Sequence, residues 1–343
     1  MKEFEGYSKG INLGGWLSQC CHTKEHYKSF INESDIAKIA KWGFDHVRLP
    51  IDAELVMDQS GSFIEDGFSY IDSCISWCRE NKLNMILDLH KTNGYSFDEN
   101  CNSFFERPKL QEQFVCFWDQ ISKKYGEHYD MLAFELLNEV VEKSYAEPWN
   151  KIAARAVAVI RKNAPMTKII IGGVQNNSVL WVDKLDTPYD KNIVYTFHLY
   201  EPLIFTHQGA YWIDDMPEDF KIEYPESREL YEQETENCLS AEQGEFLRNI
   251  SSSVIDKEFF RKAIAGAISY AEKKGVPLYC GEMGVIDRAA GASAVRWFED
   301  VCGVLSENHI GYAMWNYRGK DFGLSDEHYK EFLPDIIKAA CGI

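Results

Sequence analysis

The feature that most constrains the fold is a repeated alternation of short apolar segments with amphipathic helical patterns. Eight segments have the apolar character of buried strands: 10–15, 45–50, 84–90, 131–139, 168–174, 192–200, 277–284 and 310–317. Helical periodicity lies between them, near 34–42, 67–81, 109–125, 147–163, 257–274, 291–307 and 327–340, whereas the connection at 177–187 is short and has no clear helical pattern. Eight such units in succession predict an α/β fold, a (β/α)8 TIM barrel.

A doubly wound sheet is the alternative arrangement of the same units. The segment GINLGG (10–15) does not match the G-x-G-x-x-G phosphate turn, and no P-loop occurs, so nothing favours that alternative. A length of 343 residues would suggest two domains, but α/β barrels reach this size as one. We therefore expect one domain over 1–343. Residues 201–256 are too long for an ordinary loop and predict an inserted subdomain after the sixth strand.

The charge and composition exclude several classes of partner. Lys and Arg number 36 against 54 Asp and Glu, and the resulting charge of −18 disfavours nucleic acid and anionic membranes. No stretch is long enough to span a membrane. The N-terminus, MKEFEGYSKG, lacks the apolar region of a signal peptide, which leaves open a cytoplasmic protein or a secreted one with a trimmed signal. The 14% aromatic content fits stacking on sugar rings or a large core.

The ten cysteines are expected to be free thiols. Several of them lie in apolar helix or strand patterns, which favours buried thiols over disulfides and indicates a reducing or anaerobic setting. Cys74 and Cys78 have a spacing that could face one metal ion, but no second pair or nearby histidine completes a site. We therefore expect no metal and no cofactor.

Polar residues gather where the predicted strands end. They are Arg48, His90, Asn138, Glu139, His198, Tyr200, Glu282 and Trp315. Each alone could have a structural explanation, such as a satisfied core histidine or a core tryptophan. Together they are hard to explain in that way, because the carboxyl ends of barrel strands converge on one open face where active sites lie.

Glu139 and Glu282 suggest a division of labour. They follow the fourth and seventh strands, which lie three steps apart around an eight-stranded barrel and face each other obliquely across its mouth. Two carboxyl groups that flank one glycosidic bond are the requirement of a glycosidase: about 5–5.5 Å apart for retention, roughly 6.5–9.5 Å for inversion. One must be protonated and the other ionised, which their repulsion and different neighbours would favour.

The chain resembles glycoside hydrolase family 5 over essentially its whole length. The matching segments are KGINLGGWLSQ, GFDHVRLP, DLH, AFELLNEVVE, HLYEPLIFTHQGAYW, LYCGEMGVI and WNY. A leucine-asparagine-glutamate motif followed by a distant glycine-glutamate motif, together with HVRLP and HLY, is a specific combination. The resemblance implies a single catalytic domain of a retaining β-glycanase that needs no cofactor.

The resemblance also implies roles for the matched residues. Glu139 would be the general acid/base, Glu282 the nucleophile, and Asn138 a hydrogen-bond partner of the sugar 2-hydroxyl. Arg48 and Tyr200 would keep Glu282 ionised and oriented, and His198 would tune the surroundings of Glu139. His90 and Trp315 would line the subsite on the non-reducing side of the cleaved bond, and Trp212 in the inserted segment would contact the cleft.

Substrate preference is less constrained than mechanism. Relatives usually read His-Ala-Pro-Gly after the DLH motif, whereas this chain reads Lys91-Thr92-Asn93-Gly94 in a loop that borders the sugar subsites. We expect an endo-β-1,4-glucanase acting as a monomer on cellulose-like or mixed-linkage β-glucan. The alternatives within the family are a β-1,3-glucanase, a mannanase or glucomannanase, and a xyloglucanase. An alternative from another class is a catalytically silent sugar-binding barrel.

Overall fold

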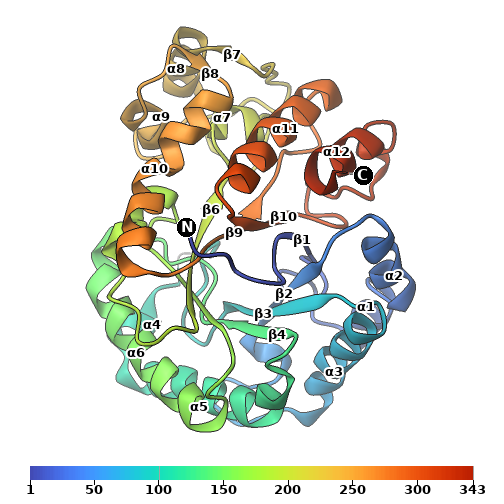
Figure 1. The fold of residues 1–343 in the computed structure, drawn as a ribbon, viewed down its shortest axis with the longest axis vertical. Coiled ribbons are helices and arrows are strands. Elements are labelled where there is room, and N and C mark those ends of the chain that lie inside the picture. The colour runs from blue at the N-terminus through green and yellow to red at the C-terminus, as the bar shows by residue number, and fades with distance from the viewer. Residues whose placement is uncertain (100, 343) are drawn as a thin grey trace.

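A computed structural model describes residues 1–99 and 101–342, and it confirms the predicted barrel (Figure 1). The closed sheet has the order β1-β10-β9-β6-β5-β4-β3-β2, with all neighbours parallel. Its strands are β1 (Lys9–Asn12), β2 (His46–Asp52), β3 (Asn84–Lys91), β4 (Leu132–Glu135), β5 (Ile169–Gly172), β6 (Ile193–Leu199), β9 (Leu278–Met283) and β10 (Gly311–Met314). Strand β4, which precedes Glu139, and strand β9, which contains Glu282, are three steps apart, as predicted.

Helices surround the sheet at nearly the predicted positions. They are α2 (Glu33–Lys41), α3 (Glu65–Glu80), α5 (Pro108–Tyr125), α6 (Ala146–Asn163), α10 (Lys257–Lys274), α11 (Gly291–Glu307) and α12 (Leu333–Cys341), with shorter α1 (Lys24–Ser29) and α4 (Ser103–Glu106) in loops. The Asn32 and Asp35 side chains form a capping box at the start of α2. The connection between β5 and β6 holds only a 3-10 helix, Val179–Lys184.

Several boundaries differ from the sequence prediction, and two of them have a clear physical reason. The helix expected at 327–340 begins at Leu333, after a separate 3-10 turn at Glu327–Tyr329, because proline is accepted in the first turn of a helix and Pro334 lies there. The strand expected at 131–139 ends at Glu135, since its ladder with β5 pairs only two residues. Beyond that point the chain leaves the ladder and approaches β3, where the backbone N–H of Asn138 donates to the Leu89 carbonyl at 3.0 Å.

The barrel interior is apolar at the base and polar toward the mouth. Ile86, Ala133 and Ile170 pack at the base, which Phe4 and Tyr7 cover with rings stacked at 4.2 Å between centroids. Because strand side chains alternate between the two faces, inward residues on β3 recur at every second position. Asp88 and His90, further along β3, are therefore directed into the upper interior, where both are buried.

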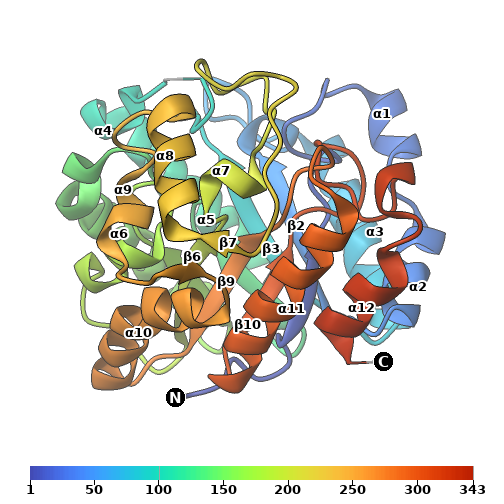
Figure 2. The same ribbon diagram turned by 90° about the horizontal axis from the view of Figure 1, so that it is seen from above.

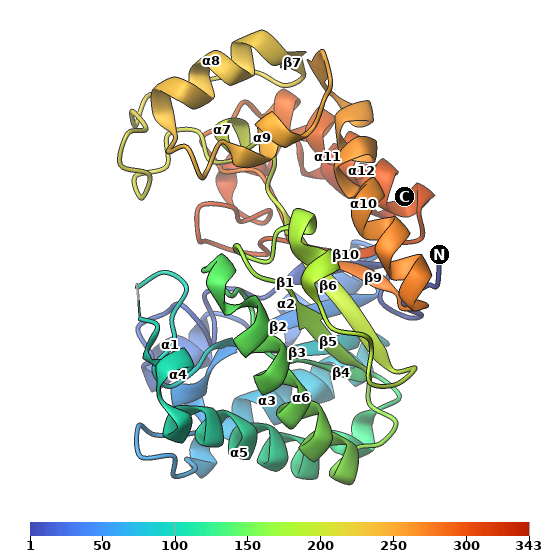
Figure 3. The same ribbon diagram turned by 90° about the vertical axis from the view of Figure 1, so that its left-hand side faces the viewer.

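The segment 201–256 carries α7 (Leu203–Thr206), β7 (Glu226–Ser227), α8 (Arg228–Cys238), α9 (Glu245–Asn249) and β8 (Val254–Ile255). These elements group together on one side of the barrel, toward the top of Figures 1 and 3. Hydrogen bonds attach them to α11: the Tyr224 hydroxyl donates to Asp300 at 2.7 Å, and Arg296 Nε donates to the Tyr224 carbonyl at 2.7 Å. From this grouping we propose that 201–256 is a subdomain inserted into one larger domain.

The two ends of the barrel differ in what they carry. In Figure 2 the N-terminus and the end of α12 lie toward the lower edge, and the loop that follows α7 rises at the upper edge. All ten cysteines are free thiols, as expected. No helix in the described ranges is both long and apolar enough to cross a membrane.

Candidate active site

A buried arginine organises the upper interior of the barrel. Arg48 lies within β2, below the strand end where the sequence suggested it, and is fully buried. Its Nε and Nη2 atoms donate to the two carboxylate oxygens of Glu135 at 2.7 and 2.9 Å, and Nη2 also lies 3.0 Å from Asp88 Oδ2. Burial alone would lower the pKa of Arg48, but the surrounding carboxylates raise it, so the guanidinium stays charged.

The same guanidinium also holds two residues of the predicted site. Its Nη1 atom donates to Glu282 Oε1 at 2.7 Å and to Asn12 Oδ1 at 2.9 Å, and Nη2 donates to Asn138 Oδ1 at 2.8 Å. The planar guanidinium donates in fixed directions, so these bonds fix the orientation of the side chains they reach. Glu135, the carboxylate inside the apolar segment 134–137, is therefore the structural partner of the arginine that positions Asn138 and Glu282.

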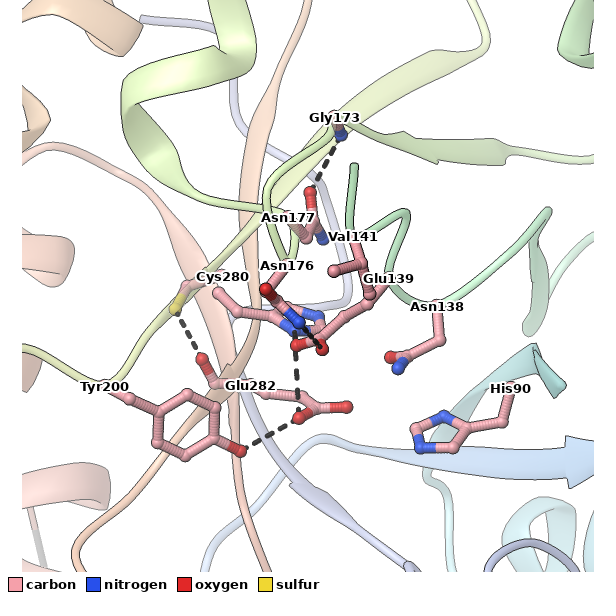
Figure 4. A network of polar contacts seen from close by, with 12 residues as sticks. His90, Asn138, Glu139, Val141, Gly173, Asn176, Asn177, Tyr200, Cys280 and Glu282 are labelled. Atoms are coloured by element: carbon pink, nitrogen blue, oxygen red, sulfur yellow. Dashed lines mark hydrogen bonds and ion pairs between the residues drawn. The ribbon is translucent and has the colours of Figure 1, made fainter. Parts of the chain in front are cut away.

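Glu282 is held as an oriented carboxylate. It is the penultimate residue of β9 and is 5% exposed. Arg48 donates to one carboxylate oxygen. The Tyr200 hydroxyl donates to the other at 2.8 Å, as Figure 4 shows. Burial, with the Glu282 charge, raises the pKa of Tyr200, so its phenol retains the proton that it donates. Two donors, one of them cationic, hold both oxygens of the Glu282 carboxyl group in one orientation.

Glu139 has a different environment. His198 Nδ1 lies 2.7 Å from its Oε1 atom, and Asn176 Nδ2 donates to Oε2 at 3.1 Å. Burial raises the pKa of Glu139 to about 7 and lowers that of His198 to about 4, so a neutral imidazole faces the Glu139 carboxyl group. The Tyr95 hydroxyl donates to the Glu139 carbonyl at 2.6 Å and fixes the backbone there. At neutral pH Glu139 can both hold and release a proton.

The two carboxyl groups are close together. One oxygen of Glu139, one of Glu282 and a ring nitrogen of His198 all lie within 4.8 Å of one another. This spacing fits the roughly 5–5.5 Å of a retaining pair and is too short for the water that an inverting pair must admit. Among the described residues these three also form the one cluster with metal-ligand spacing. Hydrogen bonds to His198, Tyr200 and Arg48 already account for the arrangement.

Figure 4 shows His90 and Asn138 to one side of the carboxyl pair. His90 Nδ1 lies 2.6 Å from Asp88 Oδ2, and burial lowers the pKa of His90 to about 4. The rings of His90 and Trp315 are parallel within 3°, with 5.7 Å between centroids. Trp315, directly after β10, is 7% exposed and lines the same cavity as both glutamates.

Comparison with known proteins identifies the architecture and the chemistry. The family model of cellulase (glycosyl hydrolase family 5) matches residues 6–321. The chain belongs to glycosyl hydrolase family 5. This confirms the family predicted from the sequence, and with it that the protein is a glycoside hydrolase that acts on β-glucans.

Curated relatives of this family 5 enzyme match it over most of their length. It is 41% identical to cellodextrinase A of Ruminococcus flavefaciens over 314 residues, which cover 90% of this chain and 85% of the relative. It is 40% identical to endoglucanase C of Acetivibrio thermocellus over 336 residues, which cover 96% and 97%. The solved structure of a Thermotoga maritima endoglucanase superposes with a TM-score of 0.77 at 23% identity, covering 97% and 96% of the two chains, and shows the shared fold.

The cleft of the family 5 enzyme is an open cavity of about 930 Å³ at the mouth of the barrel. His90, His198, Tyr200 and Trp315 line it together with the two glutamates. Trp212, in the inserted segment, lines it from the other side and is 43% exposed. The structure thus brings together all nine residues that the sequence suggested, with Arg48 beneath the floor of the cleft.

Three side chains that hydrogen-bond to residues of this site were not predicted from the sequence. Asp88 and Asn12 are inward-facing strand residues that contact His90 and Arg48. Asn176 lies in the loop after β5, in the run 175–177 whose three residues all have a positive φ of 52° to 55°. Consecutive Asn residues just beyond a predicted strand end are an available signal, since Asn tolerates this backbone conformation better than most residues.

Proposed function

We propose that this family 5 enzyme is an endo-β-1,4-glucanase that hydrolyses cellulose-like or mixed-linkage β-glucan by double displacement. The observation that carries the proposal is the carboxyl pair, with oxygens within 4.8 Å and with opposite environments. Relatives about 40% identical to this chain are a cellodextrinase and an endoglucanase, which supports a β-1,4-glucan substrate.

In the first step Glu282 attacks the anomeric carbon while Glu139 donates its proton to the departing glycosidic oxygen. The new bond joins Glu282 to the sugar, and the aglycone leaves as an alcohol. The raised pKa of Glu139, about 7, keeps the acid available near neutral pH. Arg48 and Tyr200 hold the attacking carboxylate in position, so less freedom is lost on the way to the transition state.

In the second step water attacks the anomeric carbon, and Glu139 now accepts its proton. Formation of the ester has removed the negative charge of Glu282, whose oxygen lies within 4.8 Å of Glu139, and this loss favours an ionised Glu139. The C–O bond to Glu282 breaks, and the carboxylate returns to its two donors. Inversion at each step gives net retention.

One unpartnered polar atom lies close to the carboxyl pair. Asn138 Nδ2 is buried and has no hydrogen-bond partner within the described part of the chain. A buried polar atom without a partner is costly, and a substrate hydroxyl can relieve that cost. We assign Asn138 Nδ2 to the 2-hydroxyl of the sugar attacked by Glu282. Trp315 and His90 are assigned to the glycone side and Trp212 to the wall of the cleft.

Mutation of each glutamate tests the roles. Glu282→Ala should abolish turnover, and azide should restore it with inversion of the anomeric product, because the anion enters the vacated space. Glu139→Ala should spare the glycosylation step of activated aryl β-cellobiosides, whose leaving groups need no proton, while polysaccharide hydrolysis is lost. Equal loss on both substrates in Glu139→Ala would reverse the assignment.

The substrate is tested by initial rates on carboxymethylcellulose, barley mixed-linkage glucan, laminarin and glucomannan, with Glu282→Ala as the blank. Rapid release from the first two, absent in the blank, is the expected result. Preference for laminarin or glucomannan would retain the mechanism and reject the β-1,4-glucan assignment. Release that persists in the blank would reject the mechanism.

A further inference from the structure

The loop in which this chain departs from its relatives borders a second cavity beside the cleft. This second cavity, of about 540 Å³, is lined by His22, Asp52, Lys91 and the loop that follows. It is separate from the catalytic cleft, and the residues that line both cavities are Gln19, Asp98 and Lys320. These three come from the loops after β1, β3 and β10, on the side of the cleft where His90 and Trp315 lie.

We propose that Gln19, Asp98 and Lys320 form a polar wall that ends the glycone half of the cleft and thereby sets the glycone length preferred with oligosaccharides, while a polymer is still cut internally because it can pass over the wall. The inference rests on the proposed function, because it takes the His90 and Trp315 side as the glycone side. A glucan whose glycone part is longer than the space up to the wall must pass over the wall, and its extra sugar units gain no further contact with the protein. The second cavity would supply further contact if the wall were absent.

Contacts between the loops hold the wall in place. Gln19 Nε2 donates to Asp98 Oδ2 at 3.4 Å, and Lys320 Nζ donates to the Gln19 carbonyl at 3.1 Å. The backbone N–H of Gln19 donates to the buried Asp52 side chain at 3.0 Å. Gln19 and Lys320 both have positive φ, 51° and 56°, a conformation that non-glycine residues adopt only where surrounding contacts impose it. The wall is therefore built into the loops.

Lys91, the first residue of the loop at 91–94, holds the wall residue Asp98 in place. Its Nζ atom lies 2.8 Å from Asp98 Oδ1, which also accepts from Ser96 Oγ at 2.5 Å. Burial would raise the pKa of Asp98, but the hydrogen bonds from Lys91 and Ser96 outweigh it and lower that pKa, so Asp98 is ionised. Asp98 Oδ1 thus accepts from two donors and Oδ2 from one, which holds the carboxylate in place and leaves a single acceptor site on Oδ2.

The rest of the tetrapeptide shapes the loop that carries Asp98. Asn93 Nδ2 donates to the Asp58 carbonyl at 2.9 Å, and Gly94 turns the chain with a φ of 76°. A β-carbon at Gly94 would lie 2.4 Å from a Leu110 methyl group, so this turn requires glycine. Contacts of Lys91, Asn93 and Gly94 thus position the loop that brings Asp98 to the cleft.

The test measures where oligosaccharides are cut. Cellotetraose, cellopentaose and cellohexaose are hydrolysed in ¹⁸O-water, which labels the new reducing end of the glycone product, and mass spectrometry reports its length. Wild-type enzyme should give one dominant glycone length with all three substrates. The double variant Gln19→Ala/Asp98→Ala should raise the ratio of longer to shorter glycone products from cellohexaose by about tenfold, the factor that 1.4 kcal/mol of added binding supplies.

A second variant and a matched control keep the test decisive. Lys320→Gly opens the wall from the opposite loop, and glycine accepts the positive φ there. Asp66→Ala removes another lysine-aspartate pair of the same 2.8 Å length, with Lys24, away from the cleft, and should leave the product lengths unchanged. Rates on an aryl β-cellobioside show that each variant is folded and active.

The outcomes separate the wall from the proposed function. Longer glycone products from either wall variant, with the control unchanged, support the wall. Unchanged product lengths in both wall variants, or glycone products from wild-type enzyme that lengthen with the substrate, overturn it while leaving the mechanism intact. Hydrolysis that survives Glu282→Ala would overturn the proposed function itself.

Discussion

Replacing Asn176 by glycine should raise the pH at which the enzyme loses activity on the alkaline side. Asn176 Nδ2 donates to Glu139 Oε2 at 3.1 Å, and a donor to a carboxylate favours its charged form. Burial raises the pKa of Glu139 to about 7, and the Asn176 bond opposes that rise. Removing the donor therefore raises the pKa further. Glycine is chosen because the residue has a φ of 52°.

The size of the shift follows from the strength of the bond. A hydrogen bond to a charged group contributes roughly 1.5–3 kcal/mol, and Asn176 is exposed, so water replaces part of that and the lower end applies. Since about 1.36 kcal/mol corresponds to one pKa unit, the pKa of Glu139 should rise by about one unit, to about 8. The general acid works only when protonated. At pH 8 the variant should therefore retain about fivefold more of its own maximal rate than the wild type does.

The assay is the pH dependence of kcat/KM on barley mixed-linkage glucan, a neutral polymer, because this parameter reports the pKa values of the free enzyme. Gln175→Gly is the matched control: it changes the adjacent residue, which also has a positive φ of 55° but donates to Glu245 instead of Glu139. Its alkaline limb should stay in place. An alkaline limb that is unmoved or lowered in Asn176→Gly, or one that moves equally in the control, would refute the reasoning.

Three further predictions concern the same network. Tyr200→Phe removes the 2.8 Å bond to Glu282 and should lower kcat about tenfold to a hundredfold in steady-state kinetics; an unchanged kcat would contradict its positioning role. Arg48→Met leaves Glu135 without its buried partner and should cost about 3–5 kcal/mol of unfolding free energy in urea titrations; an unchanged midpoint would contradict this. Glu139→Gln should be more stable than wild type by up to about 3 kcal/mol at pH 8 but not at pH 4. Because the pKa of Glu139 is raised in the folded state, the wild type loses unfolding free energy as pH rises from 4.5 to about 7, whereas the glutamine variant does not. An equal gain in stability at pH 4 and pH 8 would contradict this prediction.

Much of the fold could be predicted because its signals are local. Helices α6, α10 and α11 begin and end within one residue of the predicted ranges, since the helical period and the residues that end helices lie in the sequence itself. The strands were predicted less well. The segments at 131–139 and 310–317 remain apolar after β4 and β10 have ended at Glu135 and Met314. Hydrophobicity reports burial, whereas the end of a strand depends on the neighbouring ladder.

The site could be predicted to the extent that it lies at strand ends. Glu139 and Glu282 could be paired from the order of the strands alone, because a closed barrel brings the fourth and seventh strands to one mouth. The partners of these residues could not be predicted in this way. Asn176 reaches Glu139 only through the left-handed backbone of its loop, and Asp88 reaches His90 only because both point into the barrel.

The sequence by itself determined the barrel and the family, and it predicted the inserted segment and the carboxyl pair, because strand order, periodicity and motif are properties of the chain. Only the tertiary structure decided how the two carboxyl groups differ. Burial beside a neutral His198 raises the pKa of Glu139 to about 7, while Arg48 and Tyr200 donate hydrogen bonds to the two oxygens of Glu282. A carboxyl group's readiness to hold or release a proton depends on its neighbours in space, and residues distant in sequence become neighbours only when the barrel closes.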